Sequence, residues 1–339
     1  MDKTIKYYKG DKLHDSFPER FTVEELLVEQ IVKSNEEDSD FIVSATLEEL
    51  IPYVNKYKLD KKYLVWCDEP VWSYLFTVLK RKSVYFNENK LYEFEQDNAV
   101  EINVMNCFTN DIYFTNQHFF NDGYCINNES IEYAKRNIAN YKNKKNKACC
   151  IMGYRNSSKW NFKSEENNII SLSNLRTEVA LIGFINQMLD IYGQDWPANI
   201  SLGNFRSDVN LYKKKINISS EYRYALCFEN TISPFYVTEK IWQSIISGCI
   251  PIYMGGYRST IYKDFPKNSF IDYADFQDPI SLWEYVSKIS IDEYINRMTI
   301  CIKVLQRSLL FNKNNLSNKI QLRSLRLRMT NAIDNIIYT

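Results

Sequence analysis

The N-terminal part of the chain alternates between helical and strand-like spacings of apolar residues. Four apolar side chains recur at a helical spacing behind Thr22, a good helix cap: Val23, Leu26, Leu27 and Ile31. This spacing predicts a helix over 22–34. Apolar runs at 41–43 and 62–67 predict two strands, with a helix between them that opens at Thr46. Alternating strands and helices predict the α/β fold class with a parallel sheet.

A polar run separates this part from a second α/β segment. Residues 142–147 (KNKKNK) contain no apolar member and have the composition of a solvated linker. Behind them, 148–153 resembles a buried strand and 179–189 an apolar-rich helix. A chain of 339 residues is long for one hydrophobic core. We therefore predict two domains, 1–145 and 146–339.

Residues 222–256 have the pattern of a strand, a helix and a second, parallel strand. The apolar run 224–228 predicts the first strand and 249–254 the second. Thr238 is placed to cap the helix between them, and Gly248 is placed to end it. The buried side of this helix carries four apolar residues: Ile241, Trp242, Ile245 and Ile246.

The polar residues of this segment indicate an anion site. In a strand–helix–strand unit, the loop after the first strand and the helix N-terminus face a ligand crevice that favours anions. Lys240, in the first helical turn, is electrostatically out of place unless a diphosphate lies in front of it. The Glu239 carboxylate suits ribose hydroxyls, which donate hydrogen bonds, and Asn230 and Tyr236 border the same crevice. Taken alone, Thr238, Glu239 and Lys240 are better explained as a capped, solvated helix start.

Composition and charge narrow the set of partners. Lys plus Arg and Asp plus Glu number 42 each, so we expect neither nucleic acid nor an anionic membrane as a partner. The eight cysteines form no C-x-x-C pair and there are only two histidines, which argues against a zinc site. Several cysteines lie in apolar runs, as Cys149 and Cys249 do, and we expect reduced thiols in the core.

The two ends of the chain are polar and basic. Residues 1–12 are polar with no apolar stretch behind them, so we expect no signal peptide, no transmembrane segment and a cytoplasmic location. Residues 318–337 mix apolar side chains with four basic ones and predict a basic helix. Contact with a membrane surface is one role for such a helix. We favour the alternative, in which its apolar stripe packs on its own domain.

One long string in the second half carries a family resemblance. FENTISPFYVTEKI, which starts at Phe228, is followed by GCIPIYMG, which ends at Gly255. This pattern resembles the signature of the α1,3/4-fucosyltransferases, glycosyltransferase family 10, and its length makes chance agreement improbable. Three shorter elements are similar as well: 173–176 (SNLR), 190–193 (DIYG) and 264–271 (DFPKNSFI). The resemblance covers roughly 150–290, and the first domain is much less similar.

The resemblance implies a fold and an activity. The fold is the GT-B architecture, in which two Rossmann-like domains face each other across a cleft. The activity is the inverting transfer of L-fucose from GDP-fucose to a glycan hydroxyl, usually O3 of GlcNAc or glucose. Residues 1–145 would then bind the acceptor glycan and residues 146–339 the nucleotide sugar.

The resemblance also implies roles for individual residues. Arg176 and Lys240 would neutralise the diphosphate, Glu239 would bind the ribose, and Asn230 and Tyr236 would line the nucleotide and fucose pocket. The predicted donor site has six members: Arg176, Asn230, Tyr236, Thr238, Glu239 and Lys240. Because two cations can stabilise the leaving diphosphate, we expect no required metal cofactor. Weak stimulation by Mn²⁺ or Mg²⁺ stays open.

An inverting transfer also needs a carboxylate that takes the proton of the attacking hydroxyl. Asp68 and Glu69 follow the predicted strand 62–67 directly and have aromatic residues around them. We predict Glu69 as the base, at the position that resembles the family's Glu-Ser-Pro element without its Ser, and Asp68 as the runner-up. Trp72 is a candidate to stack on the acceptor sugar or to lie in the core.

Two other functions fit the same residues. One is a transferase that uses a different GDP-sugar, since only the sugar-facing residues would differ. The other is a non-catalytic glycan- or nucleotide-binding protein of the same fold. The presence of both phosphate-binding cations and of a candidate base favours an enzyme.

Overall fold

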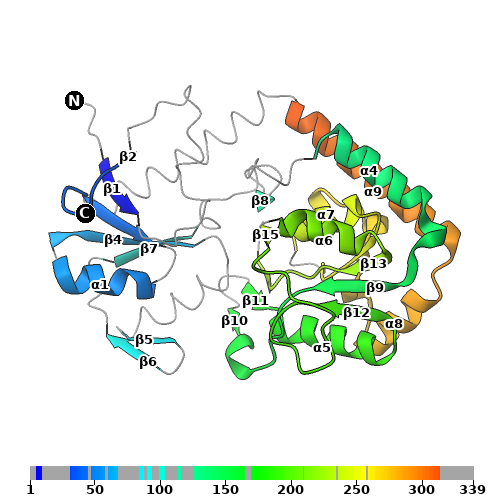
Figure 1. Cartoon of the computed structure of the whole chain (residues 1–339), viewed down its shortest axis with the longest axis horizontal. Coiled ribbons are helices and arrows are strands. Elements are labelled where there is room, and N and C mark those ends of the chain that lie inside the picture. Colours follow the sequence, from blue (N-terminus) through cyan, green and yellow to red (C-terminus); the bar gives the residue numbers. More distant parts are fainter. Residues whose placement is uncertain are drawn as a thin grey trace. The chain divides into compact units, whose positions relative to one another are not determined.

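The described residues form two compact units, which divide between Tyr113 and Phe114 (Figure 1). The computed structural model describes the following parts of the chain: 5–9, 31–44, 47–57, 60–67, 84–87, 90–93, 99–103, 114–115, 126–164, 169–208, 210–233, 236–256 and 259–313. Asp68, Glu69, Trp72 and the predicted basic helix 318–337 lie outside them.

The first unit is built on a five-stranded sheet in which every described pair of neighbours is parallel. The strand order is β2–β1–β3–β4–β7, and the strands are β1 (Ile5–Lys9), β2 (Ile31–Lys33), β3 (Phe41–Ser44), β4 (Lys62–Cys67) and β7 (Ala99–Asn103). Helix α1 (Leu47–Tyr57) packs Leu50 against Ile42 and Tyr63 of the sheet. Strands β5 (Val84–Asn87) and β6 (Lys90–Glu93) form an antiparallel pair. The predicted strands at 41–43 and 62–67, and the helix between them, are confirmed.

The helix predicted over 22–34 is wrong at its C-terminal end. Residues Ile31–Lys33 form β2, which pairs in parallel with β1 through Ile5 and Ile31. Pairing with a strand distant in sequence satisfies the backbone groups of this segment and overrides its local helical spacing. Residues 22–30 lie outside the described parts of the chain.

The second unit holds another five-stranded sheet of parallel neighbours, in the order β12–β9–β13–β16–β17. These strands are β9 (Lys145–Ile151), β12 (Leu189–Tyr192), β13 (Tyr222–Leu226), β16 (Ile250–Tyr253) and β17 (Ile271–Asp272). Smaller pairings join β10 (Lys163–Ser164) to β11 (Ile169–Ser171), β11 to β14 (Thr231–Ile232), and β15 (Tyr236–Val237) to β8 (Phe114–Thr115). The α/β class with parallel sheets is therefore confirmed in both units. That two domains face each other across a cleft remains an expectation from the family resemblance.

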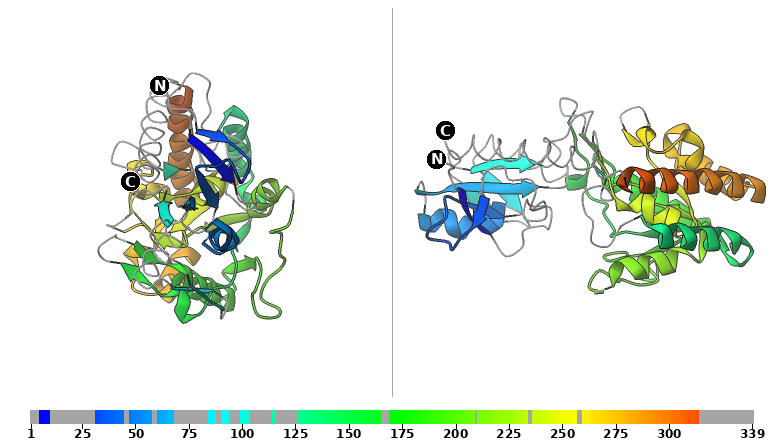
Figure 2. Two further views of the ribbon diagram at one scale, coloured as in Figure 1. Left: turned by 90° about the vertical axis from the view of Figure 1, so that its left-hand side faces the viewer. Right: turned by 90° about the horizontal axis from the view of Figure 1, so that it is seen from above.

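Helices cover both faces of this second sheet. Figure 1 shows α6 and α7 on one face and α5 with α8 on the other. The right-hand view of Figure 2 shows the long helix α9 beside α4. The helices of this unit are α4 (Asn128–Ala139), α5 (Ser173–Ile185), α6 (Leu211–Ser219), α7 (Glu239–Ile246), α8 (Pro279–Ser287) and α9 (Ile291–Lys313). The helix predicted over 179–189 thus begins and ends earlier, because Leu189 opens β12.

The strand–helix–strand unit predicted over 222–256 is confirmed. Helix α7 begins at Glu239, and β13 and β16 pair in parallel on either side of it along the chain. Gly248 ends the helix with φ +69°, a conformation that favours glycine. A Cβ there would also approach Asn137 Cβ to 2.7 Å, so the small residue is needed for packing as well.

The run 142–147 is not a solvated linker. Its second half opens β9, and Lys144 is buried, with its Nζ donating hydrogen bonds to three carbonyl oxygens. The acceptors are Ser220 at 2.6 Å, Tyr222 at 3.1 Å and Ser247 at 2.9 Å. Ser220 and Ser247 are the C-caps of α6 and α7, where a cation also complements the helix dipoles. The units therefore divide earlier than residue 145, and 126–145 belong to the second unit.

The structure also bears on the cysteines and on membrane spans. Cys149, Cys150, Cys227, Cys249 and Cys301 are buried and carry free thiols, as the sequence predicts for core thiols. Among the residues that the structure describes, no helix combines the length and apolar composition needed to cross a bilayer.

We expect Lys144→Met to lower the free energy of unfolding by about 3 kcal/mol, because it leaves three buried carbonyl oxygens without this donor. Urea unfolding followed by circular dichroism would measure the change. Lys142→Met, at an exposed position two residues earlier, is the matched control and should change stability little. Equal midpoints for the two variants would contradict the role given to Lys144.

Candidate active site

The candidate site lies where the strand order of the second sheet reverses. From β9 the chain turns to one side to form β12, and then returns past β9 to form β13 and β16. In doubly wound sheets, ligands bind outside the carboxyl ends of the strands at such a switch point. Here the switch point lies between β9 and β13, and the residues after Ile151 and Leu226 lie at it.

A buried carboxylate organises the start of α7. Glu229, in the loop after β13, is only 2% exposed. Its Oε1 accepts a hydrogen bond from the Thr238 backbone N–H at 2.7 Å, and the Thr238 hydroxyl lies 2.8 Å from Oε2. The Tyr253 hydroxyl of β16 donates to Oε1 at 3.4 Å. These contacts hold the loop, the helix start and the next strand together.

Thr238 therefore does more than its predicted role as a helix cap. It is the N-cap residue of α7, but its side chain accepts no hydrogen bond from the helix backbone. The hydroxyl instead bridges Glu229 and the Lys240 ammonium, which lies 2.7 Å away. The cap position thus orients the two charged groups beside it.

Lys240 is held by the same carboxylate. Its Nζ lies 2.9 Å from Glu229 Oε2, and its side chain keeps 30% exposure. A cation in the first turn of a helix is disfavoured by the helix dipole. The ion pair with Glu229 offsets that cost and fixes the ammonium at the crevice that the sequence predicts.

Arg176 reaches the site from a different helix. It is a buried residue in the first turn of α5, whose start is tied to the loop after β13 by a 2.8 Å hydrogen bond from Leu172 N to Asn230 O. Three residues further along α5, Val179 O accepts a hydrogen bond from Trp283 Nε1 of α8 at 2.9 Å. Backbone and core contacts thus set the position of the guanidinium.

Arg176 and Lys240 meet at one small cavity. Its volume is about 70 Å³, and its lining includes both residues together with the ends of β9 and β13. Four further polar side chains from α6 and α7 complete the wall: Lys215, Ser219, Gln243 and Ser244. The structure thus brings the two predicted phosphate-binding cations together at the switch point.

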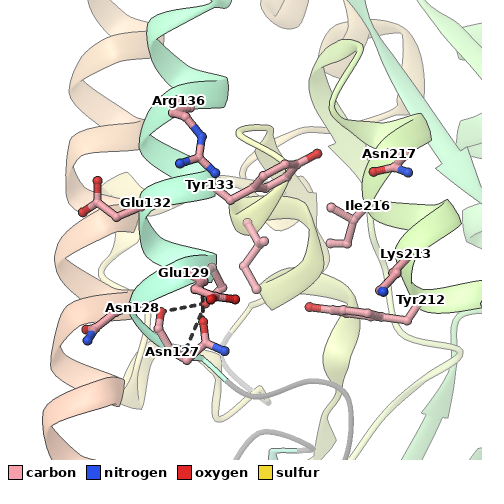
Figure 3. A pocket seen from close by; sticks show the side chains of 12 residues that line it. Asn127, Asn128, Glu129, Glu132, Tyr133, Arg136, Tyr212, Lys213, Ile216 and Asn217 are labelled. Atoms are coloured by element: carbon pink, nitrogen blue, oxygen red, sulfur yellow. Dashed lines mark hydrogen bonds between the residues drawn. The ribbon is translucent and has the colours of Figure 1, made fainter.

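A larger pocket of about 830 Å³ lies elsewhere in the same unit, between α4, α6 and α7. Figure 3 shows Tyr133 of α4 and Tyr212 of α6 pointing into it. No predicted site residue lines this pocket. Because the cations and the strand ends gather at the smaller cavity, we place the candidate site there.

Glu239 lies between two ammonium groups. Its Oε1 is 3.8 Å from Lys240 Nζ and 3.8 Å from Lys215 Nζ, and its side chain is 14% exposed. Burial alone would raise the pKa of Glu239, but Lys240 and Lys215 outweigh it and lower the pKa from 4.5 to about 2. The carboxylate is thus held ionised, as an acceptor of hydrogen bonds from hydroxyl groups must be.

Asn230 and Tyr236 are buried beside the site rather than at the cavity. Asn230 directly follows Glu229, and Tyr236 lies in β15, whose backbone pairs with Phe114 of β8. Neither lines the small cavity. Their contact with the donor, and the roles of Asp68, Glu69 and Trp72 outside the described residues, stay predictions.

Sequence reasoning missed two charged residues of this site. Glu229 belongs to the conspicuous FEN string, but its function as an internal anchor depends on three-dimensional contacts with Thr238 and Lys240. Lys215 is the last of three consecutive lysines in α6. It differs from Lys213 and Lys214 in lining the small cavity. A helical wheel of α6, with buried Ile216 and Ser219 on its inner side, would have given a hint.

Comparison with protein families supports the site. Residues 144–297 match the family model described as glycosyltransferase family 10 (fucosyltransferase), C-terminal part. This part of the chain is thus similar to the C-terminal part of glycosyltransferase family 10. The matched residues include every described member of the site: Arg176, Lys215, Glu229, Thr238, Glu239 and Lys240.

Individual members of the family are similar over shorter stretches. Alpha-(1,3)-fucosyltransferase B of Drosophila melanogaster is 36% identical over 114 residues, which cover 33% of this chain and 25% of that protein. The 4-galactosyl-N-acetylglucosaminide 3-alpha-L-fucosyltransferase 9 of Mus musculus is 29% identical over 123 residues, which cover 35% and 32%. The chain therefore matches a quarter to a third of the length of these family 10 relatives.

Solved structures of α1,3-fucosyltransferase are similar over most of the chain. The complex with GDP-fucose is 17% identical and has a TM-score of 0.43, with 87% of this chain and 81% of that chain covered. A second solved structure of α1,3-fucosyltransferase has the same coverage and a TM-score of 0.44.

The low pKa of Glu239 predicts a pH-dependent contribution to stability. Because the folded-state pKa is about 2 and the ordinary value is 4.5, the carboxylate stabilises the fold fully above pH 4.5. This contribution, about 3 kcal/mol, is lost as the pH falls from 4.5 towards 2. Urea unfolding should therefore show a difference in the free energy of unfolding between the wild type and Glu239→Gln. This difference should be constant above pH 5 and decrease below it. Glu284→Gln, at an exposed position, is the control, and a difference independent of pH for Glu239→Gln would contradict the assignment.

Proposed function

We propose that this chain is an inverting fucosyltransferase that transfers L-fucose from GDP-fucose to a glycan hydroxyl, with O3 of GlcNAc or glucose as the acceptor position. The convergence of Arg176 and Lys240 on one cavity at the switch point carries this proposal. The two cations come from different helices, α5 and α7, and both lie within the part of the chain that matches family 10. The names of the relatives support fucose as the sugar and position 3 as the linkage.

The site explains how a nucleoside diphosphate would leave. As the acceptor oxygen bonds to C1 of fucose, the bond from C1 to the β-phosphate oxygen breaks and its electron pair stays on GDP. Arg176 and Lys240 stabilise the negative charge that develops there, and both are already in place before the reaction. The acceptor proton passes to a carboxylate on the opposite face of the sugar, for which the sequence offers Glu69, with Asp68 as the alternative.

We expect no metal requirement at the donor site, since protein cations can neutralise the diphosphate. Within the described residues, no group of three or more His, Cys, Asp and Glu side chains could hold a metal ion. Activity assays with and without Mn²⁺ or Mg²⁺ would determine whether either ion stimulates the transfer. The cytoplasmic location stays a prediction from sequence.

Isothermal titration should show that the protein binds GDP-fucose without added metal, and binds GDP-mannose and UDP-galactose more weakly. Arg176→Met should weaken GDP-fucose binding about 10- to 100-fold, because it removes a charged hydrogen-bond donor from a buried site. Arg206→Met, at an exposed arginine of the same unit, is the matched control and should bind as the wild type does.

Each contrary outcome of this titration leads to a different conclusion. Equal affinity for GDP-fucose and GDP-mannose would withdraw fucose and keep a GDP-sugar transferase. Binding of a nucleotide sugar without transfer to any acceptor would favour the non-catalytic alternative. No binding by the wild type would overturn the proposed function.

A separate experiment tests the base. Glu69→Gln should lower kcat by about 10²- to 10⁴-fold, because it removes the group that accepts the acceptor proton, while the affinity for GDP stays unchanged. Asp68→Asn is the matched control, with a smaller expected effect on kcat. If Glu69→Gln keeps near-normal turnover and Asp68→Asn loses it, the base is Asp68.

A further inference from the structure

A third cation faces the small cavity. Lys215 of α6 lines it together with Arg176 and Lys240, and its side chain is 24% exposed. Its Nζ lies 3.8 Å from Glu239 Oε1, the oxygen that lies equally far from Lys240 Nζ. One carboxylate oxygen thus has two ammonium groups beside it, from two neighbouring helices.

The neighbours of Lys215 in sequence behave differently. Lys213 is exposed, and Lys214 pairs with Asp208 at 3.0 Å and lies over the Phe205 ring. Only Lys215 of the three is directed towards the site. Its position is costly: burial lowers the pKa of Lys215, Glu239 opposes that shift, and the Lys240 ammonium adds to it.

A second observation indicates that the cavity receives a ligand rich in acceptors. The Gln243 side chain lines the same wall from α7 and is buried, and its Nε2 makes no hydrogen bond within the described part of the chain. A buried amide donor without a partner is costly unless a ligand or water completes it. Phosphate oxygens have the acceptor chemistry that this donor requires.

We propose that Lys215 is a positioning residue that holds the Glu239 carboxylate in the orientation in which it binds the ribose hydroxyls of GDP. This inference rests on the proposed function and extends it to a residue of α6. Lys240 belongs to the same helix as Glu239, whereas Lys215 belongs to α6. Lys215 ties it to a second helix, and the orientation of Glu239 then follows from the packing of α6 on α7.

The test compares two nucleotides that differ only in the ribose. Wild type, Lys215→Met and Lys213→Met are titrated with GDP and with 2′,3′-dideoxy-GDP, which lacks both ribose hydroxyls that Glu239 could bind. We expect Lys215→Met to weaken GDP binding about tenfold, the loss of roughly one charged hydrogen bond. The same change should affect 2′,3′-dideoxy-GDP less than about threefold, because the contact through Glu239 is already missing. Lys215→Arg should restore most of the GDP affinity, and Lys213→Met should match the wild type with both nucleotides.

Other results would overturn the inference. An equal loss with both nucleotides would mean that Lys215 contacts the phosphates itself, and no loss with either would mean that it has no role. Failure of the wild type to bind GDP would instead overturn the proposed function on which the inference rests. If Lys215→Met does not fold, Lys215→Gln takes its place, and thermal unfolding verifies that each variant is folded.

A double-mutant cycle gives an independent measurement. In the Glu239→Gln background, Lys215→Met should produce no further loss of GDP affinity, because a positioning residue acts through the group that it positions. Additive losses for the two substitutions would contradict the proposal.

Discussion

The burial of the Glu229 carboxylate is the constraint on which the candidate site depends. A charge that is 2% exposed cannot stay unpaired, because desolvation would cost far more than one hydrogen bond returns. The described partners of Glu229 come from the start of α7 and from β16: the Thr238 backbone and hydroxyl, the Lys240 ammonium and the Tyr253 hydroxyl. Satisfying this one group therefore fixes the loop after β13, the cap of the helix and the direction of Lys240. The helix dipole would repel a lysine at this position, and Glu229 is what makes the placement stable.

The candidate site contains charged residues of both signs. Arg176, Lys215 and Lys240 contribute three positive charges to the cavity wall, and Glu229 and Glu239 pair with the two lysines. The two carboxylates differ in exposure: the side chain of Glu229 is 2% exposed and that of Glu239 is 14% exposed. The remaining positive charge faces the cavity, where an incoming diphosphate would meet cations already fixed by the fold. Such preorganisation means that little of the binding energy is consumed in rearranging the protein.

Local patterns predicted the strand–helix–strand unit within a few residues, because its elements are defined by apolar periodicity, a threonine cap and a glycine stop. Predictions that depend on distant contacts fared worse. The run KNKKNK has the composition of a linker, yet Lys144 is buried because two helix C-termini present carbonyl oxygens to it. Residues Ile31–Lys33 have a helical spacing and form a strand because β1 lies beside them. Glu229 and Lys215 were missed for the same reason, since their functions arise from contacts across loops and between helices.

The two sheets share one topology, and this bears on where the reaction partners would bind. Numbered along the chain, the strands of each sheet follow the order 2-1-3-4-5, with the switch point between the first and third strands. In the second unit the predicted phosphate cations gather at that point. In the first unit, the predicted base Glu69 follows β4, the strand next to β3 on the side away from the switch point. The prediction of Glu69 as the base therefore puts it after the strand of the first sheet that corresponds to β16 of the second.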